Sequence, residues 1–350
     1  MPRLPSLRLA SIPRAGGACV LAVAALMPAC TRTATLTVRP EPARLPEVRF
    51  PELQVPVSVV QPSLVPSHGV LFRIVAPKTP ASAADASATA APPQPRANSY
   101  VFGTIHFGKD EELGLSSERL TSAMSSSSTL VNEIDLSLPG AGNLDRYRWL
   151  APEQSLSALI SADSFAMAQT LLPQIPPETL QRMKPWMVLA LLEARGEQAG
   201  EQTLDDRLQR LASERGMRVV HLETAEDQLR ALDCIASETQ ALVLDERLKA
   251  PQVMREMSER ALTHYRGRDL GAWLTDVDRM AGLSTQGQDI EMRARRCLIE
   301  ERNQRWLPEL LALLDQGGCY IAVGAIHLPG ENGLLAALVN AGYRIEAEPL

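Results

Sequence analysis

The stretch at residues 320–335, YIAVGAIHLPGENGLL, contains the pattern on which the fold depends. It reads as an apolar strand, a glycine, two small or apolar residues, His327, a polar turn with glycines and the start of a helix. The same order recurs at residues 99–114, SYVFGTIHFGKDEELG, where the histidine is His106. A single Gly-x-x-His is more often a hydrogen-bonded turn. Two copies in a chain with five histidines favour two halves of one site.

Strand and helix patterns alternate along the rest of the chain, which predicts an α/β fold. We expect a central β-sheet with helices on its faces, a large helical insertion in the middle, and a hairpin formed by the first two strands. Strands are expected at 69–76, 99–106, 128–136, 217–223, 319–327 and 343–349. Helices are expected at 115–127, 155–172, 184–199, 203–216, 224–282, 287–314 and 333–342.

The first residues have the composition of an export signal. Three arginines precede the apolar run AGGACVLAVAALMPAC, and no acidic residue occurs before it. This order is typical of a secretory signal peptide, here residues 1–29. The ending LMPAC resembles a lipobox, so Cys30 is a candidate for lipidation, with plain signal cleavage as the alternative. We therefore expect an exported protein on the periplasmic side of a bacterial envelope, anchored to a membrane by lipid.

Composition divides the remainder of the chain into a tether and one folded unit. Residues 30–65 are rich in proline and are expected to form an extended tether. Residues 66–350 are expected to form a single α/β domain. Within its first hairpin, about residues 77–97 are rich in Ala, Pro and Ser and are expected to be disordered.

Charge and cysteine content limit the partners and the compartment. Removing residues 1–29 would remove three arginines and no acid, which takes the formal net charge from −6 to −9. This balance argues against nucleic acid as a partner. Cys234, Cys297 and Cys319 would remain in an oxidising compartment, where one disulfide and one buried thiol are the simplest arrangement. Cys234 and Cys297 could pair, because both lie in helical patterns.

Four predicted strands deliver polar side chains to their carboxyl ends, where ligands collect in open α/β sheets. These residues are His106, Glu133, Glu223 and His327. Two imidazoles and two carboxylates suit a divalent transition metal. A carboxylate that does not bind the metal would serve as general base. We therefore predict a metal site at this edge of the sheet.

Other polar residues near these motifs have both structural and functional interpretations. Glu223 precedes the helix-capping Thr224 and could simply stabilise that helix. Arg302 and Asn303 fall late in a helical pattern, where a solvated helix face and an anion-positioning role are about equally supported. His221 is expected to be a satisfied core histidine more readily than a partner of Glu223.

Several segments together resemble the TraB/PrgY/GumN family, which includes the Tiki metalloproteases. The segments, in chain order, are VFGTIHFG, LVNEID, MKPWMVLALLE, VVHLETAEDQLRALD, ERNQRW and YIAVGAIHLPGENGLLAAL. The resemblance implies a fold related to erythromycin esterase and ChaN-like proteins, and metal-dependent hydrolysis with Mn or Co. It places His106, Glu133, Glu223, Arg302 and His327 on site positions.

The resulting hypothesis is an exported, metal-dependent hydrolase, and a metallopeptidase in particular. His106, His327 and Glu133 or Glu223 would hold Mn, Co or Zn, the remaining carboxylate would activate water, and Arg302 would steady a developing oxyanion. The expected substrate is a peptide or protein of the cell envelope. An esterase using the same site and a non-catalytic protein that binds a peptide or haem are the alternatives.

Overall fold

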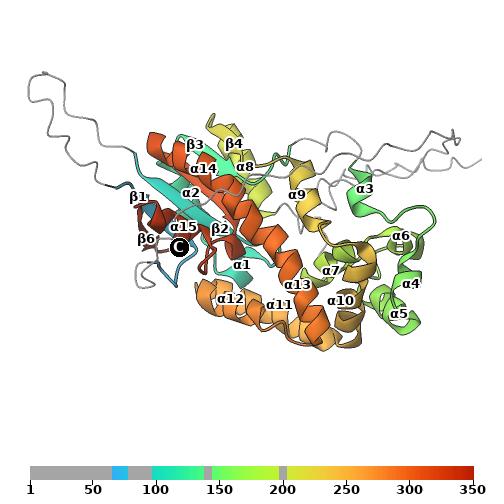
Figure 1. The fold of residues 1–350 in the computed structure, drawn as a ribbon. Coiled ribbons are helices and arrows are strands. Elements are labelled where there is room, and N and C mark those ends of the chain that lie inside the picture. Colours follow the sequence, from blue (N-terminus) through green and yellow to red (C-terminus); the bar gives the residue numbers. More distant parts are fainter. Residues whose placement is uncertain (1–64, 78–96, 138–143, 197–202) are drawn as a thin grey trace, which may run out of the picture.

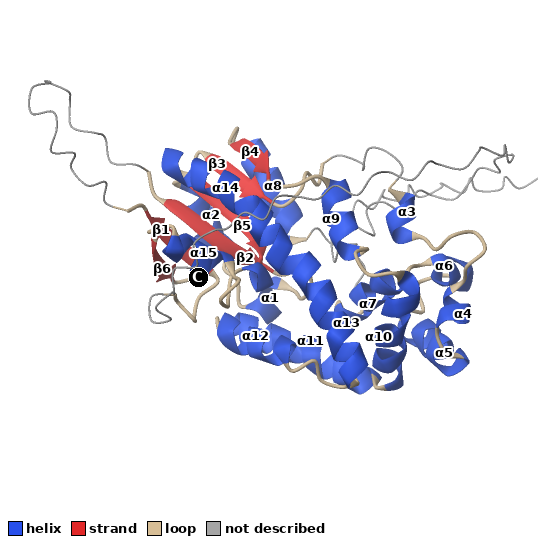
Figure 2. Cartoon of the chain, in the orientation of Figure 1, coloured by secondary structure: helices blue, strands red, loops and turns tan. Residues whose placement is uncertain are grey.

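The computed structural model describes residues 65–77, 97–137, 144–196 and 203–350. It consists of one mixed β-sheet and a large set of helices, most of which lie to one side of the sheet (Figures 1 and 2). The predicted signal segment, residues 30–64 of the tether and residues 78–96 of the predicted insertion lie outside the described residues. No helix in the described part of the chain is long and apolar enough to cross a membrane.

All six predicted strands are present in the sheet. They are β1 (Leu71–Val75), β2 (Ser99–Thr104), β3 (Thr129–Asn132), β4 (Arg218–His221), β5 (Cys319–Gly324) and β6 (Arg344–Glu348). Their order across the sheet is β4-β3-β5-β2-β1-β6. The predicted hairpin is confirmed, since β1 pairs with β2 in antiparallel fashion. The α/β fold class is therefore confirmed.

The four strands that lead to the candidate site residues run parallel to one another. β3 pairs in parallel with both β4 and β5, and β5 pairs in parallel with β2. Their carboxyl ends therefore meet at one edge of the sheet, in the spatial order β4, β3, β5, β2. β6 pairs with β1 on the far side and lies away from this group.

The helices follow the predicted ranges but are shorter and more numerous. Helices near the sheet include α1 (Asp110–Leu113), α2 (Ser117–Ser125), α8 (Leu204–Glu214), α9 (Ala225–Leu232), α14 (Glu301–Gln316) and α15 (Leu334–Asn340). The others are α3 (Asp145–Arg148), α4 (Leu156–Leu159), α5 (Ala162–Leu171), α6 (Pro177–Arg182), α7 (Pro185–Glu193), α10 (Ser237–Lys249), α11 (Pro251–Arg266), α12 (Leu270–Asp278) and α13 (Thr285–Arg295). The helical patterns expected over 155–172 and 224–282 are present, and local caps divide each of them into separate helices. Ser161 begins α5 by accepting a bond from the Ser164 N–H, and Asp269 begins α12 in the same way.

A short π-helix, η2 (Arg296–Glu300), joins α13 to α14. The N–H of Glu301 bonds to the carbonyl of Arg296, five residues earlier, instead of four. The sequence predicts a long helical stretch over 287–314, and its periodicity does not reveal this extra residue. The π-helix lies directly before Arg302, and such turns occur frequently at functional sites.

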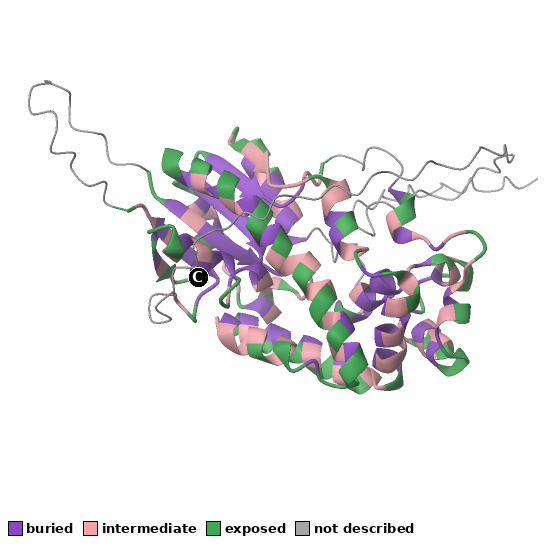
Figure 3. Cartoon of the chain, viewed as in Figure 1, coloured by how far each residue is buried: buried purple, intermediate pink, exposed green. Residues whose placement is uncertain are grey.

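Two apolar cores hold the structure together. The first contains the strands with leucines from α8, α14 and α15. The second lies within a helical lobe, which we define as residues 144–196 and 225–295, and it includes the buried indole of Trp186. Figure 3 shows that the central strands β2, β3 and β5 are largely buried, whereas β4, β6 and the outer surfaces of the lobe helices are more exposed. The predicted helical insertion is thus a second packed layer beside the sheet.

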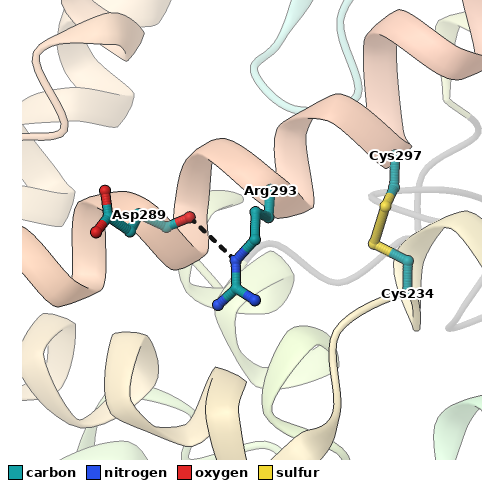
Figure 4. Close-up of a disulfide and its surroundings, with 4 residues drawn as sticks. All are labelled: Cys234, Asp289, Arg293 and Cys297. Carbon is teal, nitrogen blue, oxygen red and sulfur yellow. Dashed lines mark hydrogen bonds between the residues drawn. A yellow bond between two sulfur atoms is a disulfide. The ribbon is translucent and has the colours of Figure 1, made fainter.

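A disulfide between Cys234 and Cys297 connects the segment after α9 to η2 (Figure 4). Cys319 is a buried free thiol at the start of β5. The pairing that the sequence left as one possibility is the one present. The cross-link attaches the helical lobe to the helix that carries Arg302.

Candidate functional site

The parallel strands bring the predicted polar residues together at one edge of the sheet. His106 lies two residues beyond β2, Glu133 directly follows β3, Glu223 lies two residues beyond β4, and His327 ends a 3-10 turn after β5. β3 is shorter than expected, so Glu133 lies at the end of the strand and not within it. The backbone N–H of Glu223 bonds to the carbonyl of Glu133 at 2.9 Å, which aligns the two carboxylates.

Arg302 lies at the centre of this group. Its Nε lies 3.0 Å and 3.2 Å from the two carboxylate oxygens of Glu223, and its Nη2 lies 2.5 Å from Glu133 Oε2. Its Nη1 lies 3.1 Å from Nε2 of His327. One guanidinium therefore connects three of the predicted site residues, which come from three separate strands.

The position of Arg302 differs from the sequence expectation. It occupies the first turn of α14, not a late position in a helix, and it is 4% exposed, which excludes a solvated helix face. Its Nη1 also donates to the carbonyl of Leu298 in the π-helix, at 3.0 Å. The indole of Trp306, one turn further on, packs against it with 4.6 Å between the guanidinium carbon and the ring centre.

Both carboxylate oxygens of Glu133 accept hydrogen bonds. Oε1 accepts the backbone N–H of Gly324 at 2.7 Å, and Oε2 accepts the amide of Gln228 at 3.1 Å as well as Arg302. Gln228 lies in α9, the helix that follows β4, so this helix also helps to hold Glu133. A buried carboxylate with this many donors is stable in its ionised form.

The two carboxylates have opposite pKa shifts. Burial raises the pKa of Glu133, but Arg302, the two histidines and the Gly324 N–H outweigh burial and lower the pKa to about 2. Burial raises the pKa of Glu223 more than Arg302 lowers it, and the negative charge of Glu133 adds to the increase. Glu133 therefore has the lower proton affinity of the two carboxylates, and Glu223 has the higher.

His327 is held in one orientation by Asn303. Its Nδ1 lies 2.7 Å from Asn303 Oδ1, and the Asn303 amide donates to the carbonyls of His327 and Asn332. Because the amide group is used in this way, Oδ1 is the acceptor and Nδ1 carries the proton. Burial and Arg302 lower the pKa of His327 to about 3, so its Nε2 is unprotonated and accepts a hydrogen bond from Arg302 Nη1.

His106 has a partner that sequence reasoning missed. Its Nδ1 lies 3.2 Å from Oδ2 of Asp205, a buried residue in the first turn of α8. Burial lowers the pKa of His106, but Asp205 outweighs burial and raises it. Asp205 escaped notice because TLDD at residues 203–206 is a typical helix start, and Thr203 does cap α8. The cap explains Asp206 but not Asp205, so the additional aspartate was the feature of the sequence that could have indicated a partner for a site residue.

The glycines of the two motifs provide room for close approach, and neither has a positive φ. A Cβ on Gly103 would lie 2.9 Å from the Cα of Ala325, so the turn before His327 packs directly on β2. A Cβ on Gly324 would lie 3.4 Å from Glu133 Oε1, 3.5 Å from His327 Cδ2 and 3.8 Å from His106 Nε2. The space beside Gly324 is therefore bordered by three of the four predicted metal ligands.

The donor set fits a divalent transition metal in its chemistry and charge. Glu133, Glu223 and Asp205 supply three buried negative charges and Arg302 supplies one positive charge, which leaves two negative charges uncompensated when both histidines are neutral. As arranged around Arg302, however, no three His, Cys, Asp or Glu side chains of the described residues surround a common metal position. Binding a metal would require the guanidinium to release His327 Nε2.

His221 does not belong to this group. Its Nδ1 lies 2.6 Å from Oδ1 of Asn132, whose amide donates to Gln209 at 2.9 Å. Gln209 in turn donates to Asp135 at 2.7 Å. His221 is therefore satisfied by a separate polar network, in agreement with the structural interpretation of its sequence position.

These features define an α/β protein whose parallel strand ends carry paired Gly-x-x-His motifs and two buried glutamates around an arginine. The chain belongs to the TraB/PrgY/gumN family, whose model matches residues 93–347. It is 24% identical over 301 residues to metalloprotease TIKI1 of Danio rerio, covering 72% of this chain and 61% of that protein. The chain thus spans less than two thirds of the length of this curated relative. No solved structure matches the chain, so the expected likeness to erythromycin esterase and ChaN-like folds stays a prediction.

Proposed function

We propose that this protein is an exported, metal-dependent peptidase whose site lies at the carboxyl ends of β2, β3, β4 and β5. The observation that carries the proposal is the group of two imidazoles and the Glu133 carboxylate around the space beside Gly324, with the Glu223 carboxylate joined to it by Arg302. The similarity to a protein named a metalloprotease supports a hydrolase of this kind. The Cys234–Cys297 disulfide is in keeping with an oxidising compartment and so supports export.

We infer different roles for the two glutamates, which the sequence left interchangeable. Glu133 Oε1 borders the same space as His106 and His327, so these three residues would hold the metal. When bound, the metal would lower the pKa of a bound water and polarise the scissile carbonyl. Glu223, whose pKa is raised by burial, would accept a proton from the attacking water and return it to the departing amine.

Arg302 would have a separate role in this reaction. It is buried, fully ionised and already directed at the site edge through its contacts with Glu133, Glu223 and His327. A fixed positive charge in a poorly hydrated position stabilises an oxyanion that forms next to it. We therefore expect Arg302 to stabilise negative charge on the carbonyl oxygen and to keep Glu223 oriented.

The decisive experiment measures bound metal before activity. The full chain would be purified without chelator, and divalent metals would be quantified in the parent and in a His106→Ala, His327→Ala double variant. A His68→Ala, His264→Ala double variant is the matched control. His68 lies at the exposed start of the domain and His264 lies on α11, so neither belongs to the site. We expect one bound divalent metal in the parent and control, and none in the site variant.

A positive result would justify a peptide-library cleavage screen with and without chelator. We expect cleavage that chelator abolishes and that Mn, Co or Zn restores. A parent that stays free of metal after each of these ions has been added would rule out the metallopeptidase assignment. Metal binding without cleavage of peptides or simple esters would instead indicate a binding protein.

A further inference from the structure

The contact between His106 and Asp205 has a consequence for the first Gly-x-x-His motif. Asp205 is the second residue of α8, and its carboxylate is almost fully buried beneath the end of β2. Oδ1 accepts the hydroxyl of Thr104 at 2.9 Å. Oδ2 lies 3.2 Å from His106 Nδ1, a contact without hydrogen-bond geometry, and neither of these two buried atoms has a hydrogen-bond partner among the described residues. Each atom is therefore the natural partner of the other.

We propose that Asp205 is a positioning residue that fixes the tautomer of His106 and directs its Nε2 lone pair into the site. An ionised carboxylate can only accept a hydrogen bond, so Nδ1 must carry the proton. In the neutral ring, Nε2 is then the unprotonated nitrogen. That atom borders the space beside Gly324, close to Glu133 Oε1, so the tautomer matches the one a metal ligand needs.

The second motif uses a related arrangement with a different acceptor. His327 also has its Nδ1 proton directed at a side-chain oxygen, but the acceptor is the neutral amide of Asn303. The two motif histidines therefore present the same nitrogen to the site, one supported by an anion and the other by an amide. A carboxylate acceptor increases the basicity of the imidazole more than an amide does, so His106 would be the stronger donor.

A purely structural role for Asp205 makes a different prediction. An acid in the first turn of a helix stabilises that helix, and the bond from Thr104 fastens α8 to β2. In that case, removing either interaction would lower stability and leave the ring of His106 unaffected. The two roles are separable because Thr104 and His106 contact different oxygens of the same carboxylate.

The test compares Asp205→Asn with Thr104→Val in the full chain. The ring nitrogens of His106 would be observed by ¹⁵N NMR in metal-free protein, above the pH range in which the histidines titrate, and assigned with a His106→Gln variant. Zn²⁺ affinity would be measured by competition with an indicator chelator, and folding by circular dichroism. In the parent and in Thr104→Val we expect the proton on Nδ1. In Asp205→Asn we expect a change of tautomer and a Zn²⁺ affinity lower by about 10- to 100-fold.

The role of Asp205 in metal binding rests on the proposed function, whereas its effect on the tautomer does not. The possible results therefore test the two proposals separately. A parent with the proton on Nε2 would overturn the inference, and so would an Asp205→Asn variant with unchanged tautomer and unchanged affinity. A parent that binds no Zn²⁺ would count against the proposed function, while the NMR comparison would still decide whether Asp205 sets the tautomer.

Discussion

Glu133 accepts a hydrogen bond from the backbone N–H of Gly324, with 2.7 Å between Oε1 and N. This bond joins the end of β3 to the glycine of the second Gly-x-x-His motif. Because glycine lacks a Cβ, the carboxylate can lie directly against the backbone at this point. The bond therefore attaches the Glu133 carboxylate to the end of β5, directly before the turn that carries His327.

Glu133→Gln should destabilise the protein and abolish divalent metal binding. The substitution leaves Arg302 buried with less charge compensation, and loss of one partner of a buried ion pair costs on the order of 3 kcal/mol. Urea unfolding and metal analysis would measure both effects. Glu226→Gln is the control, because Glu226 of α9 forms an exposed ion pair with Arg146 of α3 and its loss should change neither property appreciably.

Metal-stripped protein should lose stability in acid through Glu133. Its pKa in the folded state is about 2 against an ordinary value of 4.5. A lowered pKa stabilises the folded state fully above about pH 5, and this stabilisation is lost as the pH falls from 4.5 towards 2. The difference corresponds to about 3 kcal/mol. Urea midpoints of parent and Glu133→Gln should converge over this range, and parallel curves would contradict the pKa assignment.

Gly324→Ala should separate binding from folding. The added methyl would lie at ordinary contact distances from Glu133, His327 and His106, so we expect a small change in the free energy of unfolding. It would fill the space between the metal donors, so we expect metal affinity to fall at least about tenfold. Calorimetric metal titration together with urea unfolding would check both. Unchanged metal affinity would mean that the donors do not meet beside Gly324.

Gly103→Ala should behave in the opposite way. Its methyl would lie 2.9 Å from the backbone of Ala325, which cannot move without displacing the turn before His327. Overpacking of this kind costs about 1–3 kcal/mol. We therefore expect a clear fall in the urea midpoint, whereas a stability equal to that of Gly324→Ala would show that the two glycines are equivalent.

Cys297→Ser should lower stability without removing a site residue. The disulfide joins residues 63 apart, and closing a loop of that length in the unfolded chain is worth about 4 kcal/mol in the chain-entropy model. Thermal unfolding under oxidising and reducing conditions would test this value. Reduction should destabilise the parent and leave the variant unchanged.

Much of the site could be predicted because it depends on strand ends. Apolar runs separated by helices indicate parallel strands, and parallel strands bring the residues that follow them to one edge. His106, Glu133, Glu223 and His327 were identified in this way and lie at that edge. To predict where these residues lie, it was enough to recognise each strand and to note the polar residue that follows it.

The partners of these residues could not be predicted in the same way. Asp205, Gln228 and Asn303 lie on helices, and which face of a helix meets the sheet depends on tertiary packing. Arg302 was identified, but its role as the central cation was not, because the π-helix before it changes which side chains of α14 face inward. An analysis of sequence periodicity assumes a constant number of residues per helical turn. It therefore cannot detect a place where the backbone hydrogen bond spans five residues instead of four.

The disulfide also has a consequence for how this protein could diversify. The cross-link closes residues 234–297 into a covalent ring, and His106, Glu133, Glu223, Arg302 and His327 all lie outside that ring. Helices α10 and α13 could be exchanged within this ring, because their buried residues belong to the second core. Helices α11 and α12 could not, because Leu262, Tyr265 and Leu270 are buried in the first core and the Tyr265 hydroxyl donates to the carbonyl of Gly103 at 2.7 Å. The part of the ring that can vary is therefore the part remote from the sheet.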